Sequence, residues 1–181
     1  MPDSALRPRE TLTCGPATLR RWQRNDEEAL YTAVIESLDH LRPWMPWAAA
    51  YTPETAIGFV AACEQDWNCA VAYNYAITVD GRIAGSCGLM ARIGPAGLEI
   101  GYWVHQAYVR RGLATGAAAA LAGAAFRLPG IDHVEIVHDE LNEASAAVPR
   151  KLGFTEIGSR SLDFKPEAGT GTGIVWRLTR P

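Results

Sequence analysis

Apolar positions recur first at helical and then at strand-like spacing along the chain, and these two periods predict the order of its elements. Residues 26–41 carry apolar side chains at every third or fourth position and begin at Asp26, a candidate N-cap, so they predict a helix. Residues 53–66 predict a second helix, because Pro53 suits a first helical turn. The proline-rich segment 43–53 predicts a loop between the two helices.

Short apolar runs in the middle of the chain predict strands. Residues 73–79 and 82–90 flank Asp80-Gly81, a dipeptide that favours the type I′ turn of a β-hairpin. Residues 98–104 are apolar on both faces, and such a strand is expected in the centre of a sheet.

Helices and strands alternate in the second half of the chain. Helices are expected at 112–126 and 142–152, and strands at 133–137, 154–162 and 173–179, with a further strand at 17–23 near the start. The predicted order is therefore strand, two helices, three strands, helix, strand, helix and two strands. This order predicts an α/β (α+β) layer structure, in which helices cover a mixed sheet.

Composition narrows the class of protein. The 181 residues, 48% of them hydrophobic and 20% charged, predict a single domain over 1–181 with residues 1–11 as a flexible arm. A net charge of -3 without a basic run argues against nucleic-acid binding. No apolar stretch reaches the roughly 20 residues that span a bilayer, and residues 1–10 lack the apolar core of a secretory signal. We therefore expect a cytoplasmic protein that binds no membrane. The four cysteines lack metal-ligand spacing, so no metal is expected.

The stretch VRRGLATG, residues 109–116, joins the central strand to an alanine-rich helix. The first backbone N–H groups of a helix lack internal acceptors and carry partial positive charge, so a helix that begins near Gly112 offers an anion site. Arg110 and Arg111 add charge there. Neither GxxxxGK[ST] nor GxGxxG is present, which excludes a P-loop and argues against a dinucleotide-binding Rossmann site. On its own the stretch fits both a phosphate cradle and a plain solvated helix cap.

Four segments of the chain follow one family pattern. VRRGLA fits the pyrophosphate loop Q/R-x-x-G-x-G/A, except that Val109 replaces the usual glutamine or arginine. EIGYWVHQAYVRRGLATGA (99–117) and NEASAAVPRKLGF (142–154) fit the strand–loop–helix and the later helix and turn, while LRRW and HLRPWMPWA (40–48) fit the first strand and an aromatic loop. Together they resemble the GNAT superfamily of N-acetyltransferases, in its RimJ/RimL-like (ribosomal-protein N-acetyltransferase-like) branch. The resemblance covers nearly the whole chain from about Leu12.

The resemblance implies a GNAT fold, in which two parallel strands of a mixed sheet splay apart and hold acetyl-CoA as co-substrate. Backbone groups of Tyr102, Trp103 and Val104 would pair with the pantetheine arm. Amides of the following loop would hold the pyrophosphate, and they belong to Arg110, Arg111, Gly112, Leu113, Ala114 and Thr115. Asn142 would reach the ligand near the thioester, and it also suits a plain helix N-cap.

Acyl transfer to a primary amine needs a neutral amine and a donor for the departing thiolate. Glu99, a carboxylate in an otherwise apolar strand, is the first candidate base, although it also fits a strand-start residue that faces solvent. His138 and Asp139 are weaker candidates, because such residues beside an N-cap are usually solvated.

The candidate acid departs from the usual family pattern. Many members carry a tyrosine seven positions after the asparagine, and here that position is Pro149. Ser145 matches the serine that the RimJ/RimL-like branch offers instead, so it is the predicted acid. The missing tyrosine also keeps open a non-catalytic acyl-CoA-binding or regulatory domain.

The acceptor side is predicted from the aromatic loop. Trp44, Met45 and Trp47 are expected to form the acceptor wall, with His138 beside it, although the tryptophans fit core anchors equally well. The acceptor would be a small-molecule amine or a protein N-terminus. Transfer of a bulkier acyl group such as succinyl stays open, and a basic residue above the thioester would favour it. A homodimer also stays open.

Overall fold

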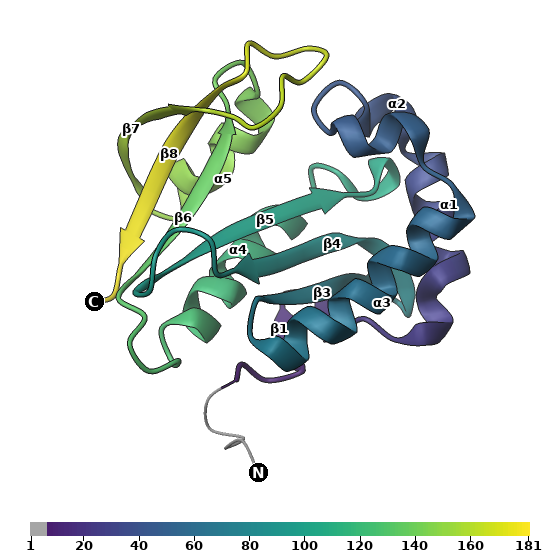
Figure 1. Cartoon of the computed structure of the whole chain (residues 1–181), viewed down its shortest axis with the longest axis horizontal. Coiled ribbons are helices and arrows are strands. Elements are labelled where there is room, and N and C mark those ends of the chain that lie inside the picture. The colour runs from purple at the N-terminus through teal and green to yellow at the C-terminus, as the bar shows by residue number, and fades with distance from the viewer. Residues whose placement is uncertain (1–6) are drawn as a thin grey trace.

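A mixed sheet of eight strands runs through the described part of the chain, residues 7–181 of the computed structural model (Figure 1). Its strands lie in the order β1-β2-β3-β4-β5-β6-β8-β7. They are β1 (Thr11–Cys14), β2 (Ala17–Arg21), β3 (Ala72–Val79), β4 (Arg82–Met90), β5 (Gly97–Val104), β6 (His133–Asp139), β7 (Thr155–Ser161) and β8 (Thr172–Thr179). Neighbouring strands are antiparallel except β5 and β6, which run parallel.

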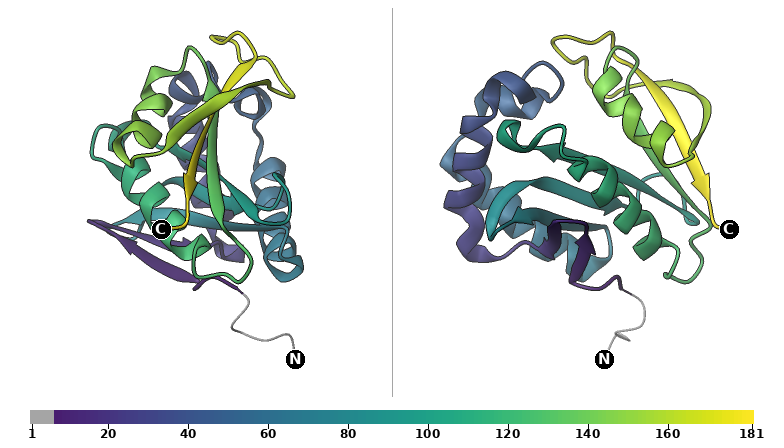
Figure 2. Two further views of the ribbon diagram at one scale, coloured as in Figure 1. Left: turned by 90° about the vertical axis from the view of Figure 1, so that its left-hand side faces the viewer. Right: turned by 180° about the vertical axis from the view of Figure 1, so that it is seen from behind.

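Helices cover both faces of this sheet (Figure 2). On one face, α1 (Glu27–Glu36) packs against α3 (Pro53–Cys69), α1 also contacts β4, and α3 contacts β3. On the other face, α4 (Leu113–Ala125) packs against β5, β4 and β1, with α5 (Glu143–Lys151) beside it. The short α2 (Leu38–Leu41) and a 3-10 turn at Pro46–Ala50 lead from α1 to α3.

Each face has its own apolar core, because successive side chains of a strand point to opposite sides. Tyr75 and Ile77 of β3 belong to the core under α4, whereas Ala76 between them belongs to the core under α1 and α3. The alanine-rich sequence of α4 suits this packing, since Ala117 and Leu121 are completely buried against the sheet.

The predicted elements are confirmed in type and order. Asp80 and Gly81 both have positive φ, +49° and +75°, as a type I′ turn requires. β5 lies between β4 and β6, the central position that its apolar faces predict. Two details differ from the prediction: β1 was missed because it has only four residues, and the first helix is interrupted at Ser37.

The predicted arm, residues 1–11, falls partly outside the described residues, which begin at residue 7. Within the described part, the carbonyl of Arg9 accepts a hydrogen bond of 2.8 Å from the Tyr75 hydroxyl, and Thr11 begins β1. The chain is therefore attached to the sheet from this point. No helix of residues 7–181 is both long and apolar enough to cross a bilayer.

Candidate active site

The parallel strands β5 and β6 pair over only half of their length. The pairing joins Gly97–Ile100 of β5 to His133–Ile136 of β6 and ends there. Beyond that point β5 stays on β4, up to the pair Val104 and Gly85, and β6 stays on β8, up to the pair Asp139 and Gly173. Because the strands part after Ile100, the edge of β5 that includes Tyr102, Trp103 and Val104 faces a gap rather than a neighbouring strand. A ligand that offers amide groups can complete this edge as a strand would.

A cavity of about 720 Å³ lies along the gap. The predicted acceptor wall lines it, since Trp44, Met45 and Trp47 all contribute. Trp47 is 41% exposed, and its ring centroid lies 6.2 Å from that of Trp103 on β5. Tyr51 extends the same aromatic surface, with its ring centroid 5.6 Å from that of Trp47. The loop therefore forms one wall of the cavity, and its contact with the acceptor stays a prediction.

The loop before α4 has the backbone geometry of an anion cradle. Gly112 is the N-cap residue of α4 with φ of +75°, and no side chain caps the helix there. The N–H groups of the first helical turn, which includes Leu113, Ala114 and Thr115, therefore have no intrahelical acceptor. Arg110 also has a positive φ of +62°, and the Arg111 guanidinium lies 5.1 Å from the centroid of the Tyr108 ring. These features fit a pyrophosphate.

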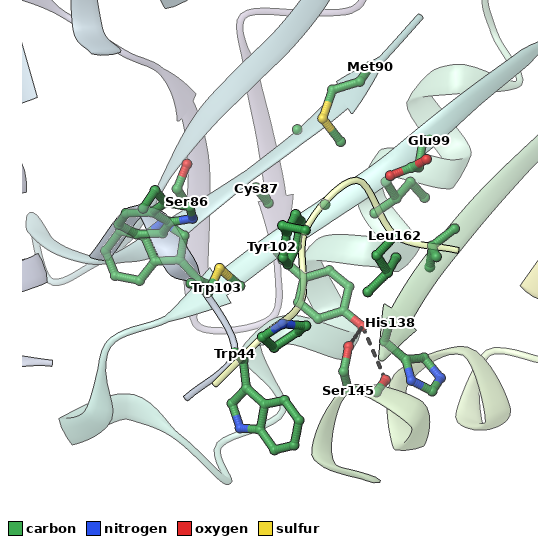
Figure 3. A pocket seen from close by; sticks show the side chains of 18 of the residues that line it. Trp44, Ser86, Cys87, Met90, Glu99, Tyr102, Trp103, His138, Ser145 and Leu162 are labelled. Atoms are coloured by element: carbon green, nitrogen blue, oxygen red, sulfur yellow. Dashed lines mark hydrogen bonds between the residues drawn. The ribbon is translucent and has the colours of Figure 1, made fainter. Parts of the chain in front are cut away.

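The candidate acid, Ser145, is paired with a hydroxyl that the sequence did not single out. The Ser145 Oγ lies 3.1 Å from the Tyr102 Oη, which also donates a hydrogen bond of 3.2 Å to the Ser145 carbonyl (Figure 3). Burial raises the pKa of Tyr102 to about 12, although its hydrogen bond with Ser145 opposes this shift. The phenol is therefore protonated at neutral pH. Asn142 caps α5 by accepting a hydrogen bond of 3.1 Å from the Ser145 N–H, so both predicted roles of Asn142 remain compatible.

Glu99, the candidate base, lies apart from this pair (Figure 3). Its side chain is buried on β5 and lines the cavity. One carboxylate oxygen accepts a hydrogen bond of 2.6 Å from Arg160, and the other accepts one from Arg92. Both carboxylate oxygens are therefore already engaged by arginines, whereas a general base needs an oxygen within hydrogen-bond reach of the proton that it accepts, which argues against that role. Neither arginine was predicted, because they lie seven and 61 positions from Glu99 in the sequence.

His138 and Asp139 are buried members of β6, so the expectation of solvated loop residues was wrong for both. The His138 Nε2 accepts a hydrogen bond of 2.9 Å from the Trp176 indole, which can only donate. The His138 Nδ1 therefore carries the proton of the neutral ring and donates it to the Asp139 carbonyl at 2.8 Å. With both nitrogens engaged, His138 lines the cavity without a free basic site.

Asp139 holds the loop between β7 and β8, residues 162–171. Its carboxylate accepts hydrogen bonds from the backbone N–H groups of Leu141, Thr170 and Gly171. Burial opposes ionisation of Asp139, but these three donors outweigh it and lower its pKa. The same loop reaches the aromatic wall, because the Ala168 N–H donates to the Pro43 carbonyl at 2.9 Å. The loop therefore bridges the two sides of the cavity.

Comparison with known proteins decides the family. The family model described as Acetyltransferase (GNAT) domain matches residues 17–155, more than half of the chain. The chain belongs to the GNAT acetyltransferase family. As a member of this family, the protein is an N-acetyltransferase that takes its acetyl group from acetyl-CoA. Membership also confirms the predicted resemblance and fold.

A relative and several solved structures are similar over most of their length. YdaF of Bacillus subtilis (strain 168), whose name assigns it provisionally to the ribosomal N-acetyltransferases, is 28% identical over 147 residues, 78% of this chain and 79% of YdaF. RimL, a ribosomal L7/L12 alpha-N-protein acetyltransferase in complex with CoA, has a TM-score of 0.85 at 21% identity, over 94% of this chain and 98% of its own. The microcin C7 self-immunity acetyltransferase MccE, in complex with acetyl-CoA and AMP, has a TM-score of 0.84 at 19% identity, over 91% and 93%.

Two positions of the site depart from the family pattern. Val109 is 37% exposed at the start of the loop, and its side chain offers no hydrogen-bond donor there. Pro149 lies buried inside α5, where the usual tyrosine would stand. The Tyr102 hydroxyl instead comes from β5 and meets α5 at Ser145. Within residues 7–181, no group of three or more histidine, cysteine, aspartate or glutamate side chains could hold a metal ion.

Proposed function

We propose that the protein acetylates the α-amino group of a peptide, a protein N-terminus or a small amino compound. The observation that carries this proposal is that every candidate base in the cavity is already engaged: Glu99 by two arginines, His138 through both ring nitrogens, and Asp139 by backbone donors. An acceptor must then reach its neutral form largely by itself. An α-amino group has a pKa of about 7.7–8.0, against about 10.4 for a lysine amine, so roughly one molecule in ten is neutral at pH 7.

Acetyl-CoA would supply the activated acetyl group as a thioester. The backbone amides from Arg110 to Thr115 would hold its pyrophosphate, because the N-terminus of α4 is open and carries partial positive charge. The unpaired edge of β5 at Tyr102, Trp103 and Val104 would bind the pantetheine amides. The Asn142 side-chain nitrogen, which the helix cap leaves free, would donate to the ligand near the thioester.

The Ser145 hydroxyl would stabilise the departing thiolate by a hydrogen bond, and the Tyr102 hydroxyl would support Ser145 by a hydrogen bond of its own. A phenol with a pKa of about 12 stays protonated while it donates, and complete transfer of its proton to a thiolate is unfavourable, since thiols have a pKa near 8.5. The proton that the amine loses as the amide bond forms would pass to the departing thiolate or to solvent. Ser145 Oγ would donate to the sulfur, and the Tyr102 hydroxyl would turn its single proton from the Ser145 carbonyl to Ser145 Oγ, so the phenol polarises the serine. Glu99 remains the carboxylate predicted as base, and its replacement by glutamine tests that role.

The acceptor would enter along the aromatic wall. Trp44, Met45 and Trp47 would pack on its apolar part, and His138 would limit the depth of the cavity. A cavity of about 720 Å³ has the volume of a site for a small molecule or for the first few residues of a peptide. RimL is described as a ribosomal L7/L12 alpha-N-protein acetyltransferase, and YdaF carries the name of a ribosomal N-acetyltransferase, which supports a protein acceptor.

The direct test measures CoA release at pH 7 with peptides that carry a free α-amino group, and with lysine-like alkylamines as the comparison. We expect peptides to react at least about tenfold faster, and the difference to narrow towards pH 10 as the alkylamine loses its proton. Equal rates at pH 7 would contradict the α-amino assignment. Binding of acetyl-CoA without turnover of any amine would instead favour a non-catalytic acyl-CoA-binding domain.

A further inference from the structure

Two buried glutamates occupy equivalent positions on the parallel strands. Glu99 of β5 and Glu135 of β6 are register partners, with exposed fractions of 3% and 4%. Glu135 pairs with a single arginine, Arg177 of β8. Glu99 pairs with two, Arg92 after β4 and Arg160 of β7. One guanidinium is enough to neutralise one carboxylate, so the group around Glu99 carries one positive charge more than the group around Glu135.

The additional charge faces the cavity. Glu99, Arg92 and Arg160 all line it, whereas Glu135 and Arg177 do not. The Arg92 and Arg160 side chains are 58% and 45% exposed, although the carboxylate that holds them is buried. Solvent and ligand can therefore reach both guanidinium groups.

Most of the donors of these two arginines are free to bind a ligand. A guanidinium has five N–H donors in a planar fork that matches a carboxylate. Within residues 7–181, Arg92 and Arg160 each make one side-chain hydrogen bond, and both go to Glu99. Since Glu99 holds one arginine on each oxygen, it fixes the two forks side by side.

The other charged groups of the cavity do not neutralise this cluster. The Asp139 carboxylate is bound by backbone N–H groups, and neither nitrogen of His138 is free. Asp163 lies on the exposed part of the β7–β8 loop, and no ion pair joins it to either arginine. Glu99 alone therefore balances the two guanidinium groups.

The cluster also lies on the acceptor side of the sheet. Glu99 and Trp103 are four positions apart on β5, and because side chains of a strand alternate between its faces, both point to the same face. Trp103 packs in the core under α1 and α3 and contacts Trp47 of the aromatic wall. Glu99 also lies directly before Ile100, where β5 and β6 part. A substrate group bound here would thus lie beside the point where the two strands part.

We propose that Arg92 and Arg160, held by Glu99, bind a carboxylate of the substrate. The proposal rests on the proposed function, and it deepens it by predicting an acceptor that carries an acidic group close to its α-amino group. A dicarboxylic acyl-CoA, such as succinyl-CoA, would present the same chemistry from the donor side. The two sources are separated by experiment.

The test uses single variants that leave Glu99 paired. Arg160→Gln leaves the pair of Glu99 with Arg92, and Arg92→Gln leaves the pair with Arg160. Each variant therefore resembles the neutral pair of Glu135 and Arg177, which is folded in the same sheet. Arg24→Gln is the control, because Arg24 is 83% exposed and pairs with Glu64 away from the cavity.

In the first arm, acetyl-CoA is the donor, and peptides with aspartate or glutamate within their first three residues are compared with their asparagine or glutamine counterparts. We expect kcat/KM of the wild type to favour the acidic peptides at least about tenfold, equivalent to one charge-assisted interaction. Arg160→Gln and Arg92→Gln should lose most of this preference, and Arg24→Gln should keep it. The conservative Arg160→Lys should keep part of it.

In the second arm, calorimetry compares acetyl-CoA with succinyl-CoA, and acidic with amide peptides on the CoA-loaded protein. Tighter binding of succinyl-CoA that is lost in both arginine variants would assign the carboxylate to the donor. No preference for an anion in either arm, or a preference that survives in both variants, would overturn the proposal. The calorimetric arm needs no turnover, so it tests the arginine pair even if no amine is acetylated.

Discussion

The two faces of the β5–β6 gap are built from different kinds of groups. On the α4–α5 face, the groups that we propose to bind the donor are mainly backbone amides at the start of α4, with the hydroxyls of Tyr102 and Ser145. On the α1–α3 face, the proposed binding groups are side chains: an aromatic wall and the two arginines around Glu99. A backbone cradle tolerates many side chains and suits a donor common to the whole family. A wall of side chains changes with the sequence and suits selection of the acceptor.

The largest expected effect is the loss of acetyl-CoA affinity in Gly112→Asp, on the α4–α5 face. The added carboxylate would repel the pyrophosphate and hold a side chain at positive φ, so we expect the affinity for acetyl-CoA to fall about 100-fold or more, as a like-charge contact costs several kcal/mol. Isothermal titration calorimetry measures the affinity. Gly81→Asp is the matched control, because Gly81 has the same φ of +75° and lies in the β3–β4 hairpin turn. An unchanged affinity would show that the pyrophosphate binds elsewhere.

The next effect concerns the hydroxyl pair on the same face. Tyr102→Phe and Ser145→Ala should each lower kcat by about 10- to 100-fold, since a hydrogen bond to a charged group contributes roughly 1.5–3 kcal/mol. The affinity for acetyl-CoA should change little. Tyr73→Phe is the control, because Tyr73 is a buried tyrosine that packs on Trp67 away from the cavity. Losses no larger than that of the control would remove the pair from catalysis.

A smaller effect is expected for Glu99→Gln on the acceptor face. If Glu99 only holds the arginines, kcat should fall less than about tenfold, whereas removal of a general base typically costs 100-fold or more. The acidic limb of the pH–rate profile should also be unchanged. Glu135→Gln shows how much of the loss comes from a buried carboxylate alone. A lost acidic limb would restore Glu99 as the base.

The smallest effect concerns the loop that bridges the faces. Asp139→Asn removes the charge that binds the Thr170 and Gly171 N–H groups, and we expect the acceptor KM to rise a few-fold. The folded-state pKa of Asp139 is lowered, so its stabilisation is complete above the ordinary aspartate pKa of about 3.9 and is lost as the pH falls through the lower folded value.

Urea unfolding of wild type and variant measures this dependence between about pH 3 and about pH 7, a range that brackets the ordinary aspartate pKa of about 3.9. The difference in unfolding free energy should be largest at the upper end and shrink towards the acidic end. Asp163→Asn, an exposed residue of the same loop, is the control. A difference that does not vary with pH would mean that the Asp139 charge does not hold the loop.

Features that depend on near neighbours could be predicted from the sequence. The I′ turn at Asp80-Gly81, the open helix start at Gly112 and the Asn142 cap each involve residues within a few positions. Their signals are turn chemistry, capping and periodicity, which act over one or two turns of chain. β1 was missed because four residues with two buried positions show too little of a period.

Pairings between distant segments could not be predicted. Tyr102 meets Ser145 across 43 positions, and the His138 ring meets Trp176 across 38. Such contacts depend on strand register and on which face each residue occupies. A register shift of one residue would turn the strand side chains Tyr102, His138 and Trp176 to the other side of the sheet.

The sequence by itself therefore determined the order of elements, the family and the open helix start at Gly112, because these are set by local patterns. Only the tertiary structure decided that Glu99 is held by Arg92 and Arg160 while Glu135 is held by one arginine. The charge at each point of the cavity depends on which strands return beside β5 and β6. That order arises when the whole sheet assembles, and no local stretch of the chain contains it.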